Sequence, residues 1–377
     1  MLKERLVSVL FVGLLAVLAL RIYQKPAFKM DMLGYMANAV VIEDSDPVSI
    51  HRKVYNEINL YVPPANRQLL FGHDANAPDY QNASRADRRI NPYHFAEYLP
   101  CYAIRPVYNE LLHLLAKMGF SLVQATRLIS TTSYFFLGIL IFIWLRRYLD
   151  SRYAATFSLL LMICPPIKEL GQLTTSDCLS TAVTLASLYL IFEHHQFAIG
   201  VGILLASIYV RTDNAILTGL VVVGLLMQKQ LDFWKAGVLL LVALGSVLAI
   251  NHFSGDYGMK MLYYRNFIGY PPNPGEFVAQ FTARDYLRAM RSGVTNTADG
   301  FFLPFFLAGL AGFLRPGNLI LKIVGVLMCL YLLLHFILLP NYVDRWFGGY
   351  YIAMGMLAAG AISSVGLSNA HNKTRPL

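Results

Sequence analysis

The chain has 377 residues, of which 56% are apolar and only 14% are charged, and its mean hydropathy is +0.49. This composition excludes an ordinary soluble multidomain enzyme, and the abundance of Leu, Ile, Val and Phe excludes an intrinsically disordered chain. The formal net charge of +9 would suggest a nucleic-acid partner in a soluble protein. In a membrane protein basic residues first indicate sidedness, so no nucleic-acid partner is expected.

The apolar residues fall in blocks that suit membrane-spanning helices, which need roughly 20 residues each. The first block, Leu6 to Leu20, lacks a convincing small-residue cleavage site before Arg21, so we interpret it as an uncleaved helix rather than a signal peptide. Further helices are predicted over residues 123–145, 153–167, 176–192, 196–211, 214–228, 235–251, 300–314, 319–339 and 346–366. The prediction is an all-α polytopic membrane protein, a single integral membrane domain over residues 1–377 with about ten transmembrane helices.

The loops differ in length and charge. The short loops on one side are mostly basic, which by the positive-inside rule places them and both termini in the cytoplasm. Two long loops, residues 22–122 and 252–299, then face the periplasm. The first contains an amphipathic stretch, Met32 to Val40, and a second candidate region, Tyr93 to Met118, so it is expected to carry interfacial helices. Without an organelle signal, a bacterial inner membrane is expected.

The predicted topology collects ionisable residues at the outer face. Such residues at membrane helices are costly, so each is a functional candidate. They are Asp31, Asp177, Arg211, Asp213, Asp344 and Arg345.

Each candidate also has a structural interpretation. Asp31 could be an N-cap for the following helix, and Asp177 could belong to a capping sequence, which is the favoured explanation there. Arg211 and Asp213 could form an ion pair within a tight turn. Arg345 opens a predicted helix, where a cation opposes the helix dipole, so an anionic partner is expected.

The arrangement resembles the GT-C superfamily of glycosyltransferases, which use polyprenyl phosphosugars and include protein O-mannosyltransferases and bacterial aminoarabinose and arabinose transferases. The resemblance runs from residue 1 to about 355 and depends on short stretches in a fixed order. These are Lys29 to Tyr35, Arg105 to Tyr108, Met118 to Ser121, Ala125 to Leu128, Thr175 to Asp177, Tyr209 to Asp213, and Asp344 to Trp346. The Asp-Glu pair common in the family is absent, because Met32 follows Asp31.

The resemblance implies an inverting transfer of a sugar from a polyprenyl-phosphate donor to a protein, lipid or glycan acceptor at the periplasmic face. Asp31 is then the general base, and Arg345, Arg211 and Arg265 bind the donor phosphate. Supporting residues are Asp177, Asp213, Arg105 and Tyr264. A second acid would come from Glu43, Asp44, Asp74 or Asp79.

No cofactor is required by this chemistry. A divalent metal on Asp31 would be compatible with it, but no paired carboxylates demand one. The histidines and acids of the first long loop match no metal signature, and the four cysteines are scattered. Tyr264 is expected to stack on a sugar, to line a lipid groove or simply to belong to an interfacial tyrosine belt.

Three other functions compete with a glycosyltransferase. A glycan ligase shares the lipid phosphate, although a large late outer loop would be typical of it. A lipid-linked sugar transporter or flippase should have polar residues through the membrane midplane, whereas the helices here are expected to be largely apolar in the middle. A noncatalytic assembly subunit would tolerate the loss of Asp31.

Overall fold

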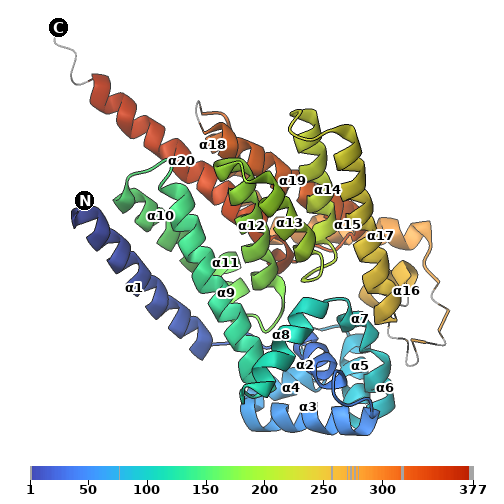
Figure 1. The fold of residues 1–377 in the computed structure, drawn as a ribbon. Helices are drawn as coiled ribbons and strands as arrows, with labels where there is room; N and C mark the ends of the chain where they lie inside the picture. Colours follow the sequence, from blue (N-terminus) through green and yellow to red (C-terminus); the bar gives the residue numbers. More distant parts are fainter. Residues whose placement is uncertain are drawn as a thin grey trace.

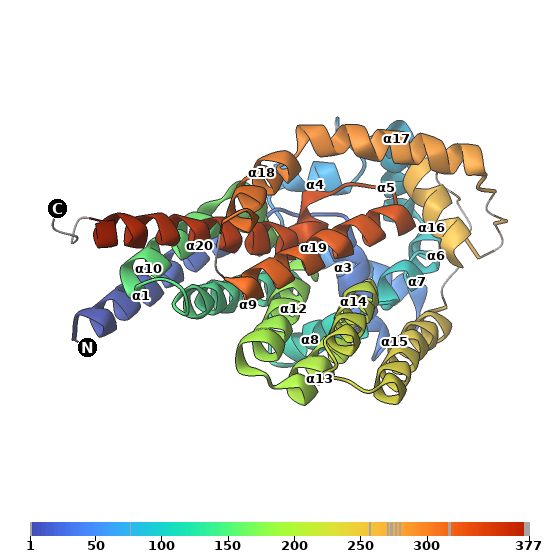
Figure 2. The same ribbon diagram turned by 90° about the horizontal axis from the view of Figure 1, so that it is seen from above.

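The computed structural model is all-helical in its described residues, apart from an isolated β-bridge between Ala27 and Leu173. The structure describes residues 2–372 apart from positions 76, 256–257, 270, 272–273, 276, 279 and 316–317. Figure 1 shows one group of helices between residues 31 and 117, the α2–α8 cluster, at one end of a bundle formed by the longer helices, and Figure 2 gives the view from above, in which the two overlap. The start of α1 and the end of α20 lie at the other end.

The bundle contains the helices predicted from the apolar blocks. They are α1 (Leu2–Gln24), α9 (Leu122–Leu145), α10 (Ser151–Ile163), α11 (Pro165–Gln172), α12 (Asp177–His194), α13 (Phe197–Ser207), α14 (Asn214–Met227), α15 (Phe233–Ser254), α18 (Phe302–Phe313), α19 (Leu319–Leu338) and α20 (Gly348–Asn372), with a 3-10 turn η1 (Asp344–Phe347) before the last. Each predicted range is occupied by a helix, with ends shifted by a few residues.

Length and apolarity make four of the described helices, α1, α9, α15 and α19, long enough to cross a membrane. The pair α10 and α11 would count as a fifth span, although it bends by 67°. The bend follows from Pro165 and Pro166, whose nitrogens carry no hydrogen to continue the helix. Helices α13, α14 and α18 are apolar but shorter. The protein is therefore expected to be membrane-embedded, and the number of ten spans stays a prediction.

The α2–α8 cluster fills most of the predicted first loop. Its helices are α2 (Asp31–Val41), α3 (Pro47–Tyr61), α4 (Pro64–Leu70), α5 (Asp79–Ile90), α6 (Pro92–Glu97), α7 (Pro100–Ala103) and α8 (Pro106–Lys117). Five of them have proline in the first turn, where its fixed φ and missing N–H cost nothing. Helix α2 is buried along almost its whole length and forms the centre of this cluster.

Backbone hydrogen bonds join the cluster to the bundle. The Ala27 N–H donates to the Gln172 carbonyl over 2.8 Å, and the Val107 N–H donates to the Tyr209 carbonyl over 3.1 Å. These contacts place the start of α2 close to the turn that precedes α12. The second predicted loop contributes α16 (Gly258–Phe267) and α17 (Ala283–Asp299).

Candidate functional site

The predicted base and a predicted phosphate ligand form a direct ion pair. Asp31 is the first residue of α2 and Arg345 lies in η1, and the Arg345 Nη2 donates to Asp31 Oδ2 over 2.7 Å. Both side chains are largely buried, with 24% and 17% of their surface exposed. Residues 314 positions apart are thus brought together where α2 meets the end of the bundle.

Asp177 extends this pair into a network. Its Oδ2 lies 3.7 Å from Arg345 Nη1, its Oδ1 accepts a short hydrogen bond from Arg211, and it accepts a hydrogen bond from the Thr175 hydroxyl over 2.5 Å. Arg211 also makes two hydrogen bonds to Asp213, of 3.0 and 2.7 Å. The turn ion pair expected for Arg211 and Asp213 is confirmed, but Arg211 additionally bridges to α12.

Two aromatic residues in α19 complete the network and were missed by the sequence analysis. The Tyr331 hydroxyl donates to Asp213 Oδ2 over 3.0 Å, and His335 Nε2 lies 3.3 Å from the same oxygen. His335 is buried, and its Nδ1 has no hydrogen-bond partner among the described residues. A histidine within a predicted membrane span was the available signal.

The capping interpretation of Asp31 is wrong, because the N-cap of α2 is Met30. The predicted capping sequence before α12 does contain the N-cap, Ser176, but Ser176 makes no side-chain capping bond. Each aspartate is instead the first helical residue and turns to an arginine. A carboxylate there is still favoured by the helix dipole, which adds to the attraction of the guanidinium groups. Arg345 has the anionic partners expected from its unfavourable position.

Two further arginines lie on an aromatic surface near Asp31. The Arg265 guanidinium in α16 lies 5.3 Å from the Tyr102 ring centroid and donates to the Tyr102 hydroxyl over 3.3 Å. Arg105, directly before α8, lies 5.2 Å over the Tyr35 ring. The positive charges of both arginines lower the pKa of Asp31.

The electrostatic balance at Asp31 favours the ionised carboxylate. Burial raises its pKa, but the charges of Arg345, Arg105 and Arg265 together with the Arg345 hydrogen bond hold the pKa below its ordinary value. Three arginines therefore lie near two carboxylates, Asp31 and Asp177, and the cluster is net cationic.

Two of these arginines keep unused hydrogen-bond donors. The buried Nη1 atoms of Arg345 and Arg265 have no hydrogen-bond partner among the described residues. A buried donor without a partner costs about 1–3 kcal/mol, and a charged one costs more. An anion between these guanidinium groups would remove that cost.

The remaining predicted residues lie elsewhere. Tyr264 in α16 packs its ring 4.7 Å from Phe277, and its hydroxyl borders Gly269. Asp344 accepts a short hydrogen bond from Tyr351 instead of joining Arg345.

The candidates for a second acid near Asp31 have other partners. Glu43 lies 3.3 Å from Lys117 Nζ, Asp74 accepts from Arg85 over 2.9 Å, and Asp44 accepts from the Asp46 N–H over 3.0 Å. Asp79 opens α5 and is exposed. The carboxylate linked to Asp31, through Arg345, is Asp177.

The described residues contain no group of three or more His, Cys, Asp and Glu side chains that could hold a metal ion. The cation that stands between Asp31 and Asp177 is Arg345 itself. A divalent metal that binds together with the substrate stays a prediction.

The interior of the bundle is more polar than predicted. Helix α12 buries Ser180, Thr181, Thr184 and Ser187. The hydroxyls of Ser180, Thr184 and Ser187 hydrogen-bond to neighbouring helices or to the backbone of their own helix. A pocket of about 300 Å³, part of it open to solvent, is lined by several of these residues together with Arg211. The expectation of helices that are largely apolar in the middle is therefore wrong for α12.

Comparison with known proteins adds no relative: the chain matches no family model, no curated protein and no solved structure.

Proposed function

We propose that the protein is a membrane-embedded glycosyltransferase that moves a sugar from a polyprenyl-phosphate-linked donor to a protein, lipid or glycan acceptor. The observation that carries the proposal is the partly buried Asp31–Arg345 ion pair, with Arg265 and Arg105 near it and with guanidinium donors that have no hydrogen-bond partner among the described residues. A carboxylate beside several guanidinium groups supplies both elements of the reaction. These are a base for the acceptor hydroxyl and an electrostatic partner for the departing phosphate.

The arginines have different roles in this proposal. Arg345 and Arg265 bind the donor phosphate, because their Nη1 donors have no hydrogen-bond partner among the described residues and a guanidinium matches phosphate oxygens. Arg211 already donates to Asp177 and Asp213, so we assign it as a positioning residue that holds Asp177 beside Arg345. This changes the role expected for Arg211 from its sequence context.

An exchange of partners makes Asp31 a better base. A carboxylate whose pKa is lowered by arginine is a weak proton acceptor. When the donor phosphate takes Arg345, Asp31 loses its cationic partner and gains an anionic neighbour, and both changes raise its pKa. Asp31 then accepts the acceptor O–H proton while that oxygen bonds to the anomeric carbon. The bond from that carbon to the phosphate oxygen breaks, the electron pair leaves with the polyprenyl phosphate, and the configuration inverts.

Native mass spectrometry of the gently extracted protein tests donor binding. Wild-type protein incubated with polyprenyl phosphosugars should retain one lipid, and Arg345→Ala should lower retention about tenfold through the loss of a charge-assisted contact. Asp31→Asn should retain the lipid but fail to release polyprenyl phosphate when membrane acceptors are added. The control is Arg288→Ala, an arginine in α17 whose side chain is 71% exposed. Retention of bulk phospholipid alone by the wild type would contradict the proposal.

One observation favours a second function, a lipid-linked sugar transporter. The polar residues of α12 and the pocket below Arg211 give the bundle interior the character expected of a transport route. Proteoliposomes loaded with labelled phosphosugar distinguish the two, since a transporter moves the intact lipid-linked sugar and a transferase breaks the sugar–phosphate bond. The mass of the product distinguishes a glycan ligase from a glycosyltransferase, because a ligase would transfer a preassembled glycan.

A further inference from the structure

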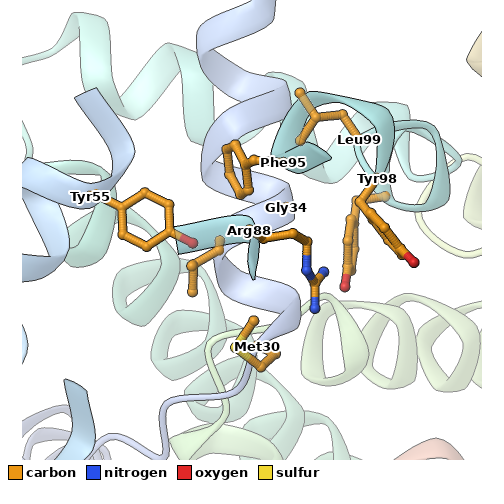
Figure 3. Close-up of a pocket in the computed structure, with 9 residues that line it drawn as sticks. Met30, Gly34, Tyr55, Arg88, Phe95, Tyr98 and Leu99 are labelled. Carbon is orange, nitrogen blue, oxygen red and sulfur yellow. The ribbon is translucent and has the colours of Figure 1, made fainter. Parts of the chain in front are cut away.

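A second pocket lies within the α2–α8 cluster, next to the proposed site. Its walls come from α2, α3, α5, α6 and α7, and Figure 3 shows the Arg88 side chain among aromatic rings. The lining includes Met30, Tyr55, Arg88, Phe95, Tyr98 and Tyr102. Met30 is the neighbour of Asp31 in the chain, and Tyr102 is the residue to which Arg265 donates. The pocket therefore shares Tyr102 with the Arg265 contact, and its residue Met30 directly precedes the proposed base in the chain.

Arg88 is a buried cation without a carboxylate partner. It is 9% exposed, and among the described residues no acidic side chain lies within ion-pair distance of it. Its Nε donates to the Ser84 carbonyl over 3.1 Å, and its guanidinium lies 4.6 Å from the Tyr98 ring centroid. These contacts hold the side chain in place but do not neutralise its charge. A buried charge without a counterion is costly, so an anion bound in this pocket would stabilise the Arg88 guanidinium.

Tyr55 adds a neutral donor to the same pocket. Its side chain is buried, and its hydroxyl has no hydrogen-bond partner among the described residues. In Figure 3 the Tyr55 hydroxyl points toward the middle of the pocket, where Arg88 enters from above. A guanidinium, a free hydroxyl and aromatic faces together match an anionic group carried on a sugar ring.

The lining side chains pack tightly around Arg88. About 250 Å³ of space lies between the lining atoms, part of it open to solvent, but no part of it has room for a free water molecule. A ligand must therefore draw the guanidinium away from the Tyr98 ring as it enters. Binding should change the exposure of α5, α6 and α7, which gives a readout at the site itself.

We propose that this pocket binds the acceptor substrate through an anionic group, a carboxylate or a phosphate attached to a sugar. The inference rests on the proposed function, because it assigns the acceptor subsite of the same reaction. Arg88 provides the charge, Tyr55 a hydrogen bond and the rings of Tyr98 and Phe95 apolar contact. The acceptor class is thus an anionic glycan or glycolipid, and a neutral sugar should bind poorly.

Hydrogen–deuterium exchange with small probes tests the pocket without any turnover. Glucuronate, inorganic phosphate and glucose are added to the detergent-solubilised full chain. At least one of the two anions should protect peptides from α5 to α7, and glucose should not. Protection by glucuronate alone supports a uronic-acid acceptor, and protection by phosphate alone supports a phosphorylated one. No protection of these peptides by either anion would overturn the proposal.

Variants separate ligand binding from a structural role. Arg88→Gln should weaken the protecting anion about tenfold or more, and Arg88→Lys should weaken it less because the charge remains. Arg89→Gln is the matched control, because Arg89 is an exposed arginine on the same helix that stacks on Phe71. If Arg88→Gln lowers thermal stability but leaves the anion affinity of the folded protein unchanged, Arg88 is structural and the proposal is wrong. If Arg88→Gln does not fold, Tyr55→Phe takes its place. It should lower the affinity for the protecting anion a few-fold, and an unchanged affinity would show that the proposal is wrong.

Failure here is distinguishable from failure of the proposed function. Donor retention in the mass spectrometer depends on Arg345 and Arg265, and anion protection depends on Arg88. If Arg88→Gln retains the donor lipid and loses anion protection, both assignments stand. If the wild type shows anion protection without retaining any donor, the pocket stands as an anion site and the glycosyltransferase proposal fails.

Discussion

At the residue scale, the site is a chain of alternating charges in which no member is independent. Buried ions are tolerated only when paired, and removing one partner of a buried pair typically costs 3–5 kcal/mol. The order along the chain is Asp31, Arg345, Asp177, Arg211 and Asp213. Asp31 lies at one end of this chain. Its partner Arg345 can therefore turn to another anion without leaving a charge in the middle of the chain unpaired.

The exchange predicts two different acid limits for the reaction. In the free protein the pKa of Asp31 lies below its ordinary value, so its carboxylate stays ionised until the pH falls through that lowered pKa. With donor bound, the phosphate takes Arg345 and the pKa rises. The acid limb of kcat, which reports the complex, should therefore lie at higher pH than the acid limb of kcat/KM, which reports the free protein.

Arg345→Ala provides the control for this pH prediction. Without its charge and hydrogen bond, burial dominates and the Asp31 pKa rises, so the acid limb of kcat/KM should move up by about 1–3 pH units. The same pKa links to stability, since the stabilisation from ionised Asp31 is present above its unfolded pKa and is lost as the pH falls through its folded pKa. The folded fraction must be measured at each pH. Coincident limbs in the wild type would argue against partner exchange.

At the element scale, the sequence predicted the long apolar helices but not the polar ones. Helices α9, α15 and α19 follow from continuous apolar blocks, which leave little choice of structure. Helices α3 and α5 were missed because they carry many charges and bury only one narrow face. Such helices are stabilised mainly by packing against neighbouring helices, and this packing cannot be read from a single sequence.

The site was predictable only where a residue stands out from its neighbours in the sequence. Asp31, Asp177 and Arg345 stand out locally because charges beside apolar blocks are rare. Tyr331 pairs with Asp213 over 118 residues of sequence, and nothing near either residue indicates that pairing. Arg88 lies in a strongly polar helix, where a buried arginine has the same local pattern as a solvated one.

Close packing of α18 on α20 gives a prediction about stability. A Cβ added at Gly312 would lie 2.5 Å from the Leu357 carbonyl oxygen, and a backbone atom cannot move aside without shifting the helix. We expect Gly312→Ala to destabilise the protein by about 1–3 kcal/mol, as overpacking does. Thermal unfolding in detergent, followed by circular dichroism, measures the change.

The matched control is Gly245→Ala in α15. A Cβ there meets nothing within 4 Å, so the substitution should gain helix propensity of about 0.5–1 kcal/mol without a clash. A loss at Gly245 equal to that at Gly312 would mean that the packing of α18 on α20 is not the cause.

At the scale of the whole molecule, the fold separates two ends. The α2–α8 cluster, with Asp31 and the Arg88 pocket, lies at one end of the bundle, and the start of α1 and the end of α20 lie at the other (Figures 1 and 2). Residues 373–377, with the predicted basic tail, lie outside the described residues. A reaction on a lipid phosphate needs this asymmetry, because the phosphate is confined to the membrane surface while its chain remains in the bilayer. The side on which the cluster lies therefore decides which acceptors it meets.

Basic short loops predict that the cluster faces the periplasm of a bacterial inner membrane. A membrane-impermeant maleimide applied to intact spheroplasts should label Asp79→Cys, an exposed position at the start of α5, and should not label Lys229→Cys, an exposed position after α14. Cys101 is replaced by serine in both variants, since it is partly exposed in α7. Labelling of Lys229→Cys should appear only after the membrane is permeabilised. The reverse pattern would place Asp31 and its arginines in the cytoplasm, and donor lipids presented on the periplasmic leaflet could then not be the substrate.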